Sequence, residues 1–237
     1  MNEVHRIIQE RQSARVPFDP NQKVSKEHLQ QISDAGRWAP TAHNMQNFSI
    51  VVVDDREVLE IIGNVKSRIS EEFLRENYEQ LSFSKEELLE KKIGILGAMF
   101  PPSWVDPSKM AEAARESIPM PLTQSIRGSP CLLILVYDPQ KRAPASEGDV
   151  LGFMSFGCVM ENMWLMAQSL GISLQILSAF AAPPVEKQVK QILCIPEQLK
   201  IAYTCRLGYP TGSAKYLRVR RDIEDFTHYN KFGNKGI

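Results

Sequence analysis

LGFMSFGCVMENMWLMAQSL, residues 151–170, is the stretch that decides the fold of this chain. It holds no lysine, arginine or proline, and Glu161 is its one acidic residue. At about 1.5 Å per residue it predicts a helical rod roughly 30 Å long, which is apolar on nearly every side and must be covered by protein or by lipid. Because Glu161, Asn162 and Gln168 would each cost free energy in hydrocarbon, we expect the central helix of a soluble protein, also used at a subunit contact, and not a membrane span.

The overall composition is that of a globular protein without a strongly charged partner. The 237 residues are 43% hydrophobic and 24% charged, and their formal net charge is zero. This balance favours neither nucleic acid nor an anionic membrane as a partner. The amino terminus lacks the pattern of a secretory signal, so we expect a cytoplasmic protein. We also expect buried thiols and no disulfide or metal site, because the cysteines are widely spaced and form no C-x-x-C pair: Cys131, Cys158, Cys194 and Cys205.

Helices and strands are predicted to alternate along the rest of the chain. Apolar periodicity and capping residues predict helices at residues 4–11, 26–37, 56–77, 85–96, 151–170 and 185–193. Apolar runs predict strands at residues 49–53, 131–137, 173–180 and 201–207. Strands separated by helices cannot pair as hairpins, so we expect a layered α/β or α+β fold. The sequence shows no internal repeat and no Gly/Ser-rich linker, which predicts a single domain over residues 1–237.

A basic cluster lies where the first predicted helix ends. Arg11 and Arg15, with Ser13 between them, precede Pro17, which forces the chain out of helical geometry. The cluster is either a solvated helix end or an anion clamp, since guanidinium groups match phosphate oxygens with paired donors. Spacing alone leaves both interpretations open.

A polar loop connects the helix at residues 26–37 to the strand at residues 49–53. Pro40 ends the helix, and Thr41, Asn44 and Gln46 then offer several hydrogen-bonding groups. The loop is either a binding loop or a turn whose side chains satisfy the local backbone, as asparagine commonly does. His43 alone does not indicate a catalytic role.

Two further segments carry an expectation each. Residues 99–124 hold five prolines among apolar side chains and form either a structural excursion over the core or a lid over a ligand. Residues 211–237 begin with a basic cluster that includes Arg218 and Arg220, and they end in an aromatic run. This tail is either a solvated basic arm or a segment that packs on another subunit.

Four stretches, in this order, resemble the nitroreductase family of FMN-dependent oxidoreductases. Residues 11–15, RQSAR, match an opening R-x-S-x-R, and residues 39–46, APTAHNMQ, match A-P-S-x-x-N-x-Q. Residues 157–171 resemble the long central helix that ends in L-G. The carboxyl end is similar as well, in LGYP at 207–210 followed by the arginine cluster and FTHYN at 226–230. Each motif alone is weak, but four in order over nearly the whole chain are specific.

The resemblance implies an α+β fold with a central, mostly antiparallel or mixed sheet flanked by helices. It also implies an intertwined homodimer that binds FMN in each of two clefts between the subunits. The proline-rich residues 97–124 would form a lid and much of the substrate wall. Residues 211–237 would be a C-terminal arm that packs on the partner subunit.

The resemblance also assigns roles to the basic residues. Arg11 and Ser13 would hold the FMN phosphate, together with Arg218 and Arg220 from the far end of the chain. Arg15 would face the pyrimidine side of the flavin, where a cation stabilises the anionic reduced ring. A dianionic phosphate needs several cations, and two basic clusters supply them.

The polar loop would reach the flavin from the partner subunit. By resemblance, Thr41, Ala42 and Asn44 contact the ring, while Pro40 and Gln46 shape that wall. Residues 176–178 would lie along the flavin edge. The full set expected at the cofactor is Arg11, Gln12, Ser13, Arg15, Pro40, Thr41, Ala42, Asn44, Gln46, Ile176, Leu177, Ser178, Arg218 and Arg220.

The implied activity is hydride transfer from NADH or NADPH through FMN to a nitroaromatic, a quinone or a similar small acceptor, with no catalytic side chain required. Two departures from the family pattern leave alternatives open. Asn47-Phe48 stands where Pro-Trp is usual, and Ser178 stands where many members have glycine. The first alternative is a flavin-fragmenting or reductively dehalogenating enzyme of the same fold. The second is a non-catalytic FMN-binding store or sensor.

Overall fold

The computed structural model describes residues 2–66, 75, 85–91, 108, 112, 126–212 and 219–235. The chain divides into two compact units, and each is described by itself. The first consists of Met1–Ser67 with Pro119–Ala214, and the second of Arg68–Ile118 with Lys215–Ile237. The sheet and most of the expected site residues belong to the first unit.

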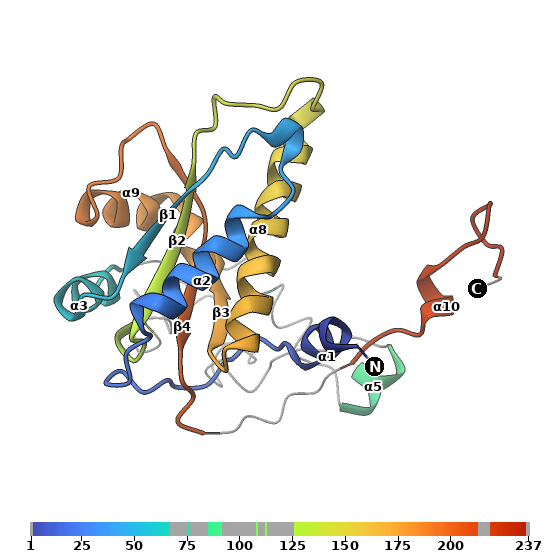
Figure 1. The fold of residues 1–237 in the computed structure, drawn as a ribbon, viewed down its shortest axis with the longest axis horizontal. Helices are drawn as coiled ribbons and strands as arrows, with labels where there is room; N and C mark the ends of the chain where they lie inside the picture. Colours follow the sequence, from blue (N-terminus) through green and yellow to red (C-terminus); the bar gives the residue numbers. More distant parts are fainter. Residues whose placement is uncertain are drawn as a thin grey trace. The chain divides into compact units, whose positions relative to one another are not determined.

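The first unit is built on a four-stranded antiparallel sheet (Figure 1). In spatial order its strands are β1 (Ser49–Val53), β2 (Cys131–Tyr137), β4 (Lys200–Gly208) and β3 (Ser173–Leu177). The predicted bounds of β1 and β2 are confirmed, and the antiparallel pairing confirms the sheet type that the family resemblance implies. β3 is shorter than predicted, because the chain turns into the 3-10 helix η6 (Ser178–Ala181) directly after Leu177.

Helices cover both faces of this sheet. α2 (Lys26–Arg37) and α8 (Val150–Ser169) pack together on one face (Figure 1). α3 (Arg56–Gly63) and α9 (Pro183–Ile192) contact each other on the other face. Successive side chains of a strand point to opposite faces, so Leu133 and Leu135 pack with α2 and α8, whereas Leu132 and Ile134 pack with α3 and α9.

The N-terminal helix α1 (Glu3–Glu10) contacts α8, and Asn2 caps it. The predicted helix at residues 26–37 is confirmed, and the Ser25 hydroxyl accepts from the His28 amide at 3.1 Å, as an N-cap should. The predicted helix at residues 56–77 is wrong in length, because α3 ends at Gly63. Asn64 closes α3 by donating from its side-chain amide to the Glu60 carbonyl at 3.0 Å.

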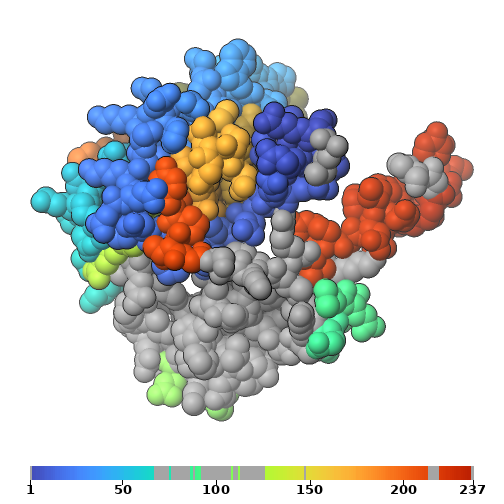
Figure 2. Space-filling model, turned by 60° about the horizontal axis from the view of Figure 1, so that its bottom comes forward, coloured from blue at the N-terminus to red at the C-terminus, as the bar shows by residue number. Residues whose placement is uncertain are grey.

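α8 is buried along one side only. Phe156, Val159, Met163 and Ala167 form its inner stripe, and one third of its apolar window is buried within this chain. By length and composition alone the helix is long enough and apolar enough to cross a membrane. Figure 2 shows α8 at the surface between α1 and α2. We expected protein to cover this helix on nearly every side. Within one chain, only part of its circumference is covered.

The cysteines divide by environment. Cys131 and Cys205 are buried thiols, as expected, and burial raises the pKa of each to about 12, with a smaller contribution from Asp54 at Cys131. Cys158 is half-buried. The expectation of a buried thiol is wrong for Cys194, which is exposed in the turn that follows α9.

The second unit contains α5 (Lys85–Glu90) and α10 (Ile223–Phe226). A capping box between Asp222 and Asp225 begins α10. Except for Ser108 and Glu112, the expected lid at residues 97–124 lies outside the described residues, as do residues 92–96 of the predicted helix.

Candidate functional site

The basic segment at residues 11–15 lies along the edge of the sheet. After α1 the chain turns at Arg11 and becomes extended, and Ser13 forms a parallel bridge with Leu174 of β3. The Ala14 amide donates to the Leu174 carbonyl at 3.0 Å. Because the two segments are parallel, the chain runs from Ser13 toward Arg15 in the same direction as β3 runs toward η6. Segment 11–15 and the end of β3 are therefore brought together, as the resemblance expects.

Arg11 is packed onto α8. Its Nε lies 3.1 Å from Glu161 Oε1, and its guanidinium carbon lies 4.5 Å from the centroid of the Trp164 ring. The Arg11 side chain is only 25% exposed, so the interpretation as a solvated helix end is wrong for this residue. Glu161 compensates part of the Arg11 charge. Binding of an anion by Arg11 stays a prediction.

The other members of the segment differ in exposure. Ser13 and Arg15 are half-buried, whereas Gln12 is exposed. At the end of β3, Leu177 is buried in the core beside Phe180, and Ser178 is exposed at the start of η6. Among residues 176–178, Leu177 is thus buried, Ile176 is half-buried and Ser178 is exposed.

A buried arginine that sequence reasoning missed holds this segment in place. Arg206 of β4 is 1% exposed, and its guanidinium group donates to the carbonyls of Ala14 at 2.9 Å and Val16 at 2.7 Å. It also donates to Gln175 Oε1 at 2.6 Å, directly across from it in β3. The signal in the sequence is a single charged residue within an otherwise uncharged run, IAYTCRL, at residues 201–207.

The polar loop is shaped largely by its own hydrogen bonds. His43, Asn44 and Gln46 have φ values of 50°, 54° and 47°, in the left-handed region. The Gln46 amide donates to Thr41 Oγ1 at 3.2 Å, and Gln46 Nε2 donates to Asn44 Oδ1 at 3.1 Å. The interpretation as a self-satisfied turn is therefore confirmed for these side chains. Pro40, His43, Asn44 and Gln46 are also exposed, so they remain accessible to a ligand.

The loop is attached to the beginning of α8. The Ala42 amide donates to Ser155 Oγ at 2.9 Å, and that hydroxyl donates to the Leu151 carbonyl at 2.7 Å. Arg11 contacts α8 at Glu161 and beyond, six or more residues later. At about 1.5 Å per residue, the loop and segment 11–15 contact α8 at positions at least roughly 9 Å apart along its axis.

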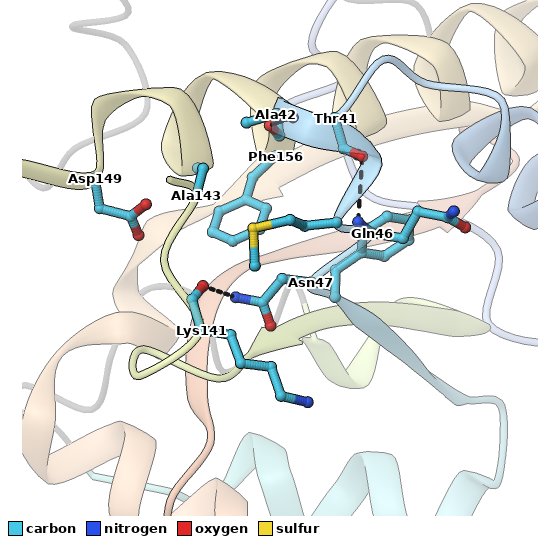
Figure 3. Close-up of a pocket in the computed structure, with 12 residues that line it drawn as sticks. Thr41, Ala42, Gln46, Asn47, Lys141, Ala143, Asp149 and Phe156 are labelled. Atoms are coloured by element: carbon cyan, nitrogen blue, oxygen red, sulfur yellow. Dashed lines mark hydrogen bonds between the residues drawn. The ribbon is translucent and has the colours of Figure 1, made fainter. Parts of the chain in front are cut away.

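A small cavity of about 20 Å³, room for about one water molecule, lies beneath the loop (Figure 3). Asn47 forms part of its wall and joins the loop to the turn after β2, because its Nδ2 donates to the carbonyls of Asp138 at 2.9 Å and Lys141 at 2.8 Å. Its Oδ1 accepts from the Asp138 amide at 3.2 Å. The side chain that departs from the family pattern is thus used for backbone hydrogen bonding. The cavity is far smaller than ligand pockets, which begin at about 300 Å³.

The C-terminal arginines belong to the second unit. Arg218 lies outside the described residues. Arg220 belongs to the second unit, where its Nη1 donates to the Val219 carbonyl at 2.7 Å. Their predicted contribution to a phosphate site therefore stays a prediction.

An antiparallel sheet between two helix pairs defines the first unit as an α+β fold. The model of the nitroreductase family matches residues 8–209, and this chain belongs to that family. Members of the family are generally oxidoreductases.

Solved structures agree with this fold. A putative NADH dehydrogenase/NAD(P)H nitroreductase from Parabacteroides distasonis is 16% identical, with a TM-score of 0.62, and the match covers 98% of this chain and 100% of that one. A nitroreductase with bound FMN from Desulfitobacterium hafniense is 21% identical, with a TM-score of 0.60 and the same coverage. A nitroreductase with bound FMN from Bacteroides fragilis is 19% identical, with a TM-score of 0.59, and the match covers 97% of this chain and 100% of that one. The predicted nitroreductase-like fold is confirmed.

Proposed function

We propose that this protein is an FMN-dependent oxidoreductase that transfers hydride from NADH or NADPH, through FMN, to a nitroaromatic, a quinone or a similar small acceptor. Family membership supports the reaction class. The observation that supports FMN as the cofactor is that Arg11, Ser13 and Arg15 lie on one segment, which is hydrogen-bonded along the edge of β3. Relatives of the same fold bind FMN.

The residues of this segment fit the cofactor chemically. A phosphate dianion is best bound by guanidinium groups and hydroxyl donors, and Arg11, Ser13 and Arg15 offer both within five residues. Glu161 cancels about one of the two positive charges. Further cations are therefore needed for a dianion, and Arg218 and Arg220 are the proposed source.

Bound FMN would supply the hydride chemistry, and the chain would supply position and electrostatics. Arg11 and Ser13 hold the phosphate, and Arg15 places a positive charge beside the pyrimidine side of the ring. Ser178 offers an exposed hydroxyl along the flavin edge. No side chain is required as a nucleophile, and water supplies the protons.

The protein is proposed to work as a homodimer. Val150, Leu151, Phe153 and Met154 are each at least 40% exposed on α8, and a second copy of the chain would cover this apolar surface. The proposed site is shared by two chains, and Thr41, Ala42 and Asn44 come from the partner. The C-terminal arm at residues 211–237 would pack on that partner.

Membrane insertion and nucleic-acid binding are not part of the proposal. A dimer covers α8 without placing Glu161 in hydrocarbon, and the formal net charge of zero gives no electrostatic footprint for a polyanion. We propose a cytoplasmic location, where the buried thiols Cys131 and Cys205 stay reduced.

The test is anaerobic mixing of the FMN-loaded protein with NADH or NADPH. Bleaching of the flavin absorbance band, followed by its return on addition of menadione or nitrofurazone, is the expected result. A protein that binds no FMN, or whose bound FMN neither nucleotide bleaches, would refute the proposal.

One observation favours a second candidate within the same fold. The exposed Ser178 replaces the glycine common at the flavin edge, which suits a flavin-fragmenting or dehalogenating enzyme. Exposure of the reduced protein to oxygen would then yield a ring-cleavage product, or a halogenated phenol would lose halide. Intact FMN and unchanged halophenol remove this candidate. Asn47 does not support the second alternative, a non-catalytic FMN store or sensor, because its side-chain amide is used in hydrogen bonds to the backbone.

A further inference from the structure

A buried guanidinium group fixes the backbone on both sides of Arg15. The Nη2 atom of Arg206 donates to the carbonyls of Ala14 and Val16, at 2.9 Å and 2.7 Å. One nitrogen thus bonds the carbonyls before and after a single residue and holds that residue between them, where the chain bends at Val16. Arg15 is that residue.

The Arg206 side chain is itself held rigidly. Its Nε donates to Gln175 Oε1 at 2.6 Å, its Nη1 lies 3.4 Å from Ser129 Oγ, and its guanidinium carbon lies 4.1 Å from the centroid of the Phe18 ring. A planar group that is bonded along its edges and stacked on a ring has little freedom to move. At 1% exposure it is also screened from solvent.

Other bonds hold the same segment at its two ends. The Ala14 amide donates to the Leu174 carbonyl, and the Thr211 amide donates to the Pro17 carbonyl, both at 3.0 Å. Between these anchors, Arg206 sets the path of the chain through residues 14–16. A change at Arg206 is therefore expected to displace Arg15 before it displaces the rest of the sheet.

We infer that Arg206 is a positioning residue that sets the reduction potential of the bound flavin through Arg15. The inference rests on the proposed function, in which Arg15 lies beside the pyrimidine side of FMN. A cation there stabilises the anionic reduced ring more than the neutral oxidised ring. The position of Arg15, and not merely its presence, then decides how much more tightly the reduced form is bound.

The expected effect follows from Coulomb's law. At an effective dielectric constant of about 20, moving a cation from about 4 Å to about 5–6 Å from a negative charge weakens the attraction enough to change an equilibrium by about four- to tenfold. The preference for reduced over oxidised FMN should fall by that factor. A tenfold fall corresponds to a potential lower by about 30 mV for a two-electron couple.

The experiment is a double-mutant cycle with Arg206→Met, Arg15→Met and the double variant. The potential of bound FMN is measured by equilibration with redox dyes, and the Kd of oxidised FMN by fluorescence quenching. Arg206→Met should lower the potential, with the preference for reduced over oxidised FMN falling about four- to tenfold, and the double variant should match Arg15→Met alone. General loosening of the fold would weaken both redox forms alike and leave the potential unchanged.

Lys190→Met provides the matched control. Lys190 is also buried, at 4% exposure, and its Nζ donates to the carbonyls of Glu197 at 2.5 Å and Leu199 at 2.7 Å, in the turn between α9 and β4. Its loss should lower the stability of the same unit without changing the potential. Arg206→Lys replaces Arg206→Met in the cycle if the latter does not unfold cooperatively, with a smaller fall of the potential expected.

Several outcomes overturn the inference. The first is a wild-type potential in Arg206→Met, and the second is an unchanged potential in Arg15→Met. The third is a double variant whose potential falls by the sum of the two single effects. The fourth is a potential that falls as much in Lys190→Met as in Arg206→Met. If the wild-type protein binds no FMN, the proposed function fails first and the inference fails with it. If the wild-type protein binds and reduces FMN but the cycle shows no coupling, only the inference fails.

Discussion

Replacing Met154 by serine tests the proposed dimer most directly. Met154 is 61% exposed on α8 within one chain, among other exposed apolar residues of the same helix. Full burial of such a side chain contributes about 1.5–3 kcal/mol, so covering the exposed fraction contributes roughly 1–2 kcal/mol per chain. A symmetric interface contains the residue twice, which gives about 2–4 kcal/mol in total.

The predicted result of Met154→Ser is a dimer dissociation constant raised by about 30- to 1,000-fold, since every 1.4 kcal/mol is tenfold. Sedimentation equilibrium over a concentration series measures it. FMN affinity should become dependent on protein concentration over the same range, because the proposed site needs both chains.

Ile61→Ser serves as the matched control. Ile61 is 52% exposed on α3, which covers the opposite face of the sheet from α8. An unchanged dissociation constant in Met154→Ser would refute the assignment of α8 to the interface. An equal rise in Ile61→Ser, or a wild-type protein that binds FMN tightly as a monomer, would refute it as well.

Three more predictions concern the cofactor site. Arg11→Ala and Arg220→Ala should each weaken FMN binding by about tenfold or more, because each leaves phosphate charge less compensated, and unchanged fluorescence titrations for both would contradict the clamp. Asn44→Ala should alter the flavin bound mainly by the other subunit, so a mixed dimer with wild-type chains should titrate as one normal and one weakened site. Asn47→Ala should lower the free energy of unfolding by about 1–3 kcal/mol in urea while leaving the rate of flavin reduction unchanged; a change in rate at unchanged stability would show that Asn47 acts in the chemistry.

Local signals were enough to predict the elements whose ends are decided by neighbouring residues. Ser25 caps α2, and the bounds of that helix follow from it. β2 could be predicted because a strand buried on both faces reads as an unbroken apolar run. The end of α3 was missed although its signal is local: Asn64 caps the helix and donates from its side-chain amide to the Glu60 carbonyl.

The candidate site divides in the same way. The motif at residues 11–15 marked the basic segment, and the polar loop was visible as a run of hydrogen-bonding residues. The partners that hold these segments were not visible. Arg206 meets Ala14 across 192 positions of sequence, and Ala42 meets Ser155 across 113. No local pattern encodes such pairs; they follow from the order of the strands in the sheet and from the packing of α8 against it.

The proposed dimer would account both for the one-sided burial of α8 and for the separate positions at which the polar loop and the basic segment contact that helix. One chain holds its polar loop at the beginning of α8 and its basic segment near Glu161 and Trp164, so the two segments contact the helix at different positions. A second copy related by a two-fold axis would bring its own loop toward the first chain's basic segment while covering the exposed apolar residues of α8. Because the same contact would bury the apolar surface and complete the site, dimerisation and cofactor binding should be coupled, each strengthening the other by the same factor.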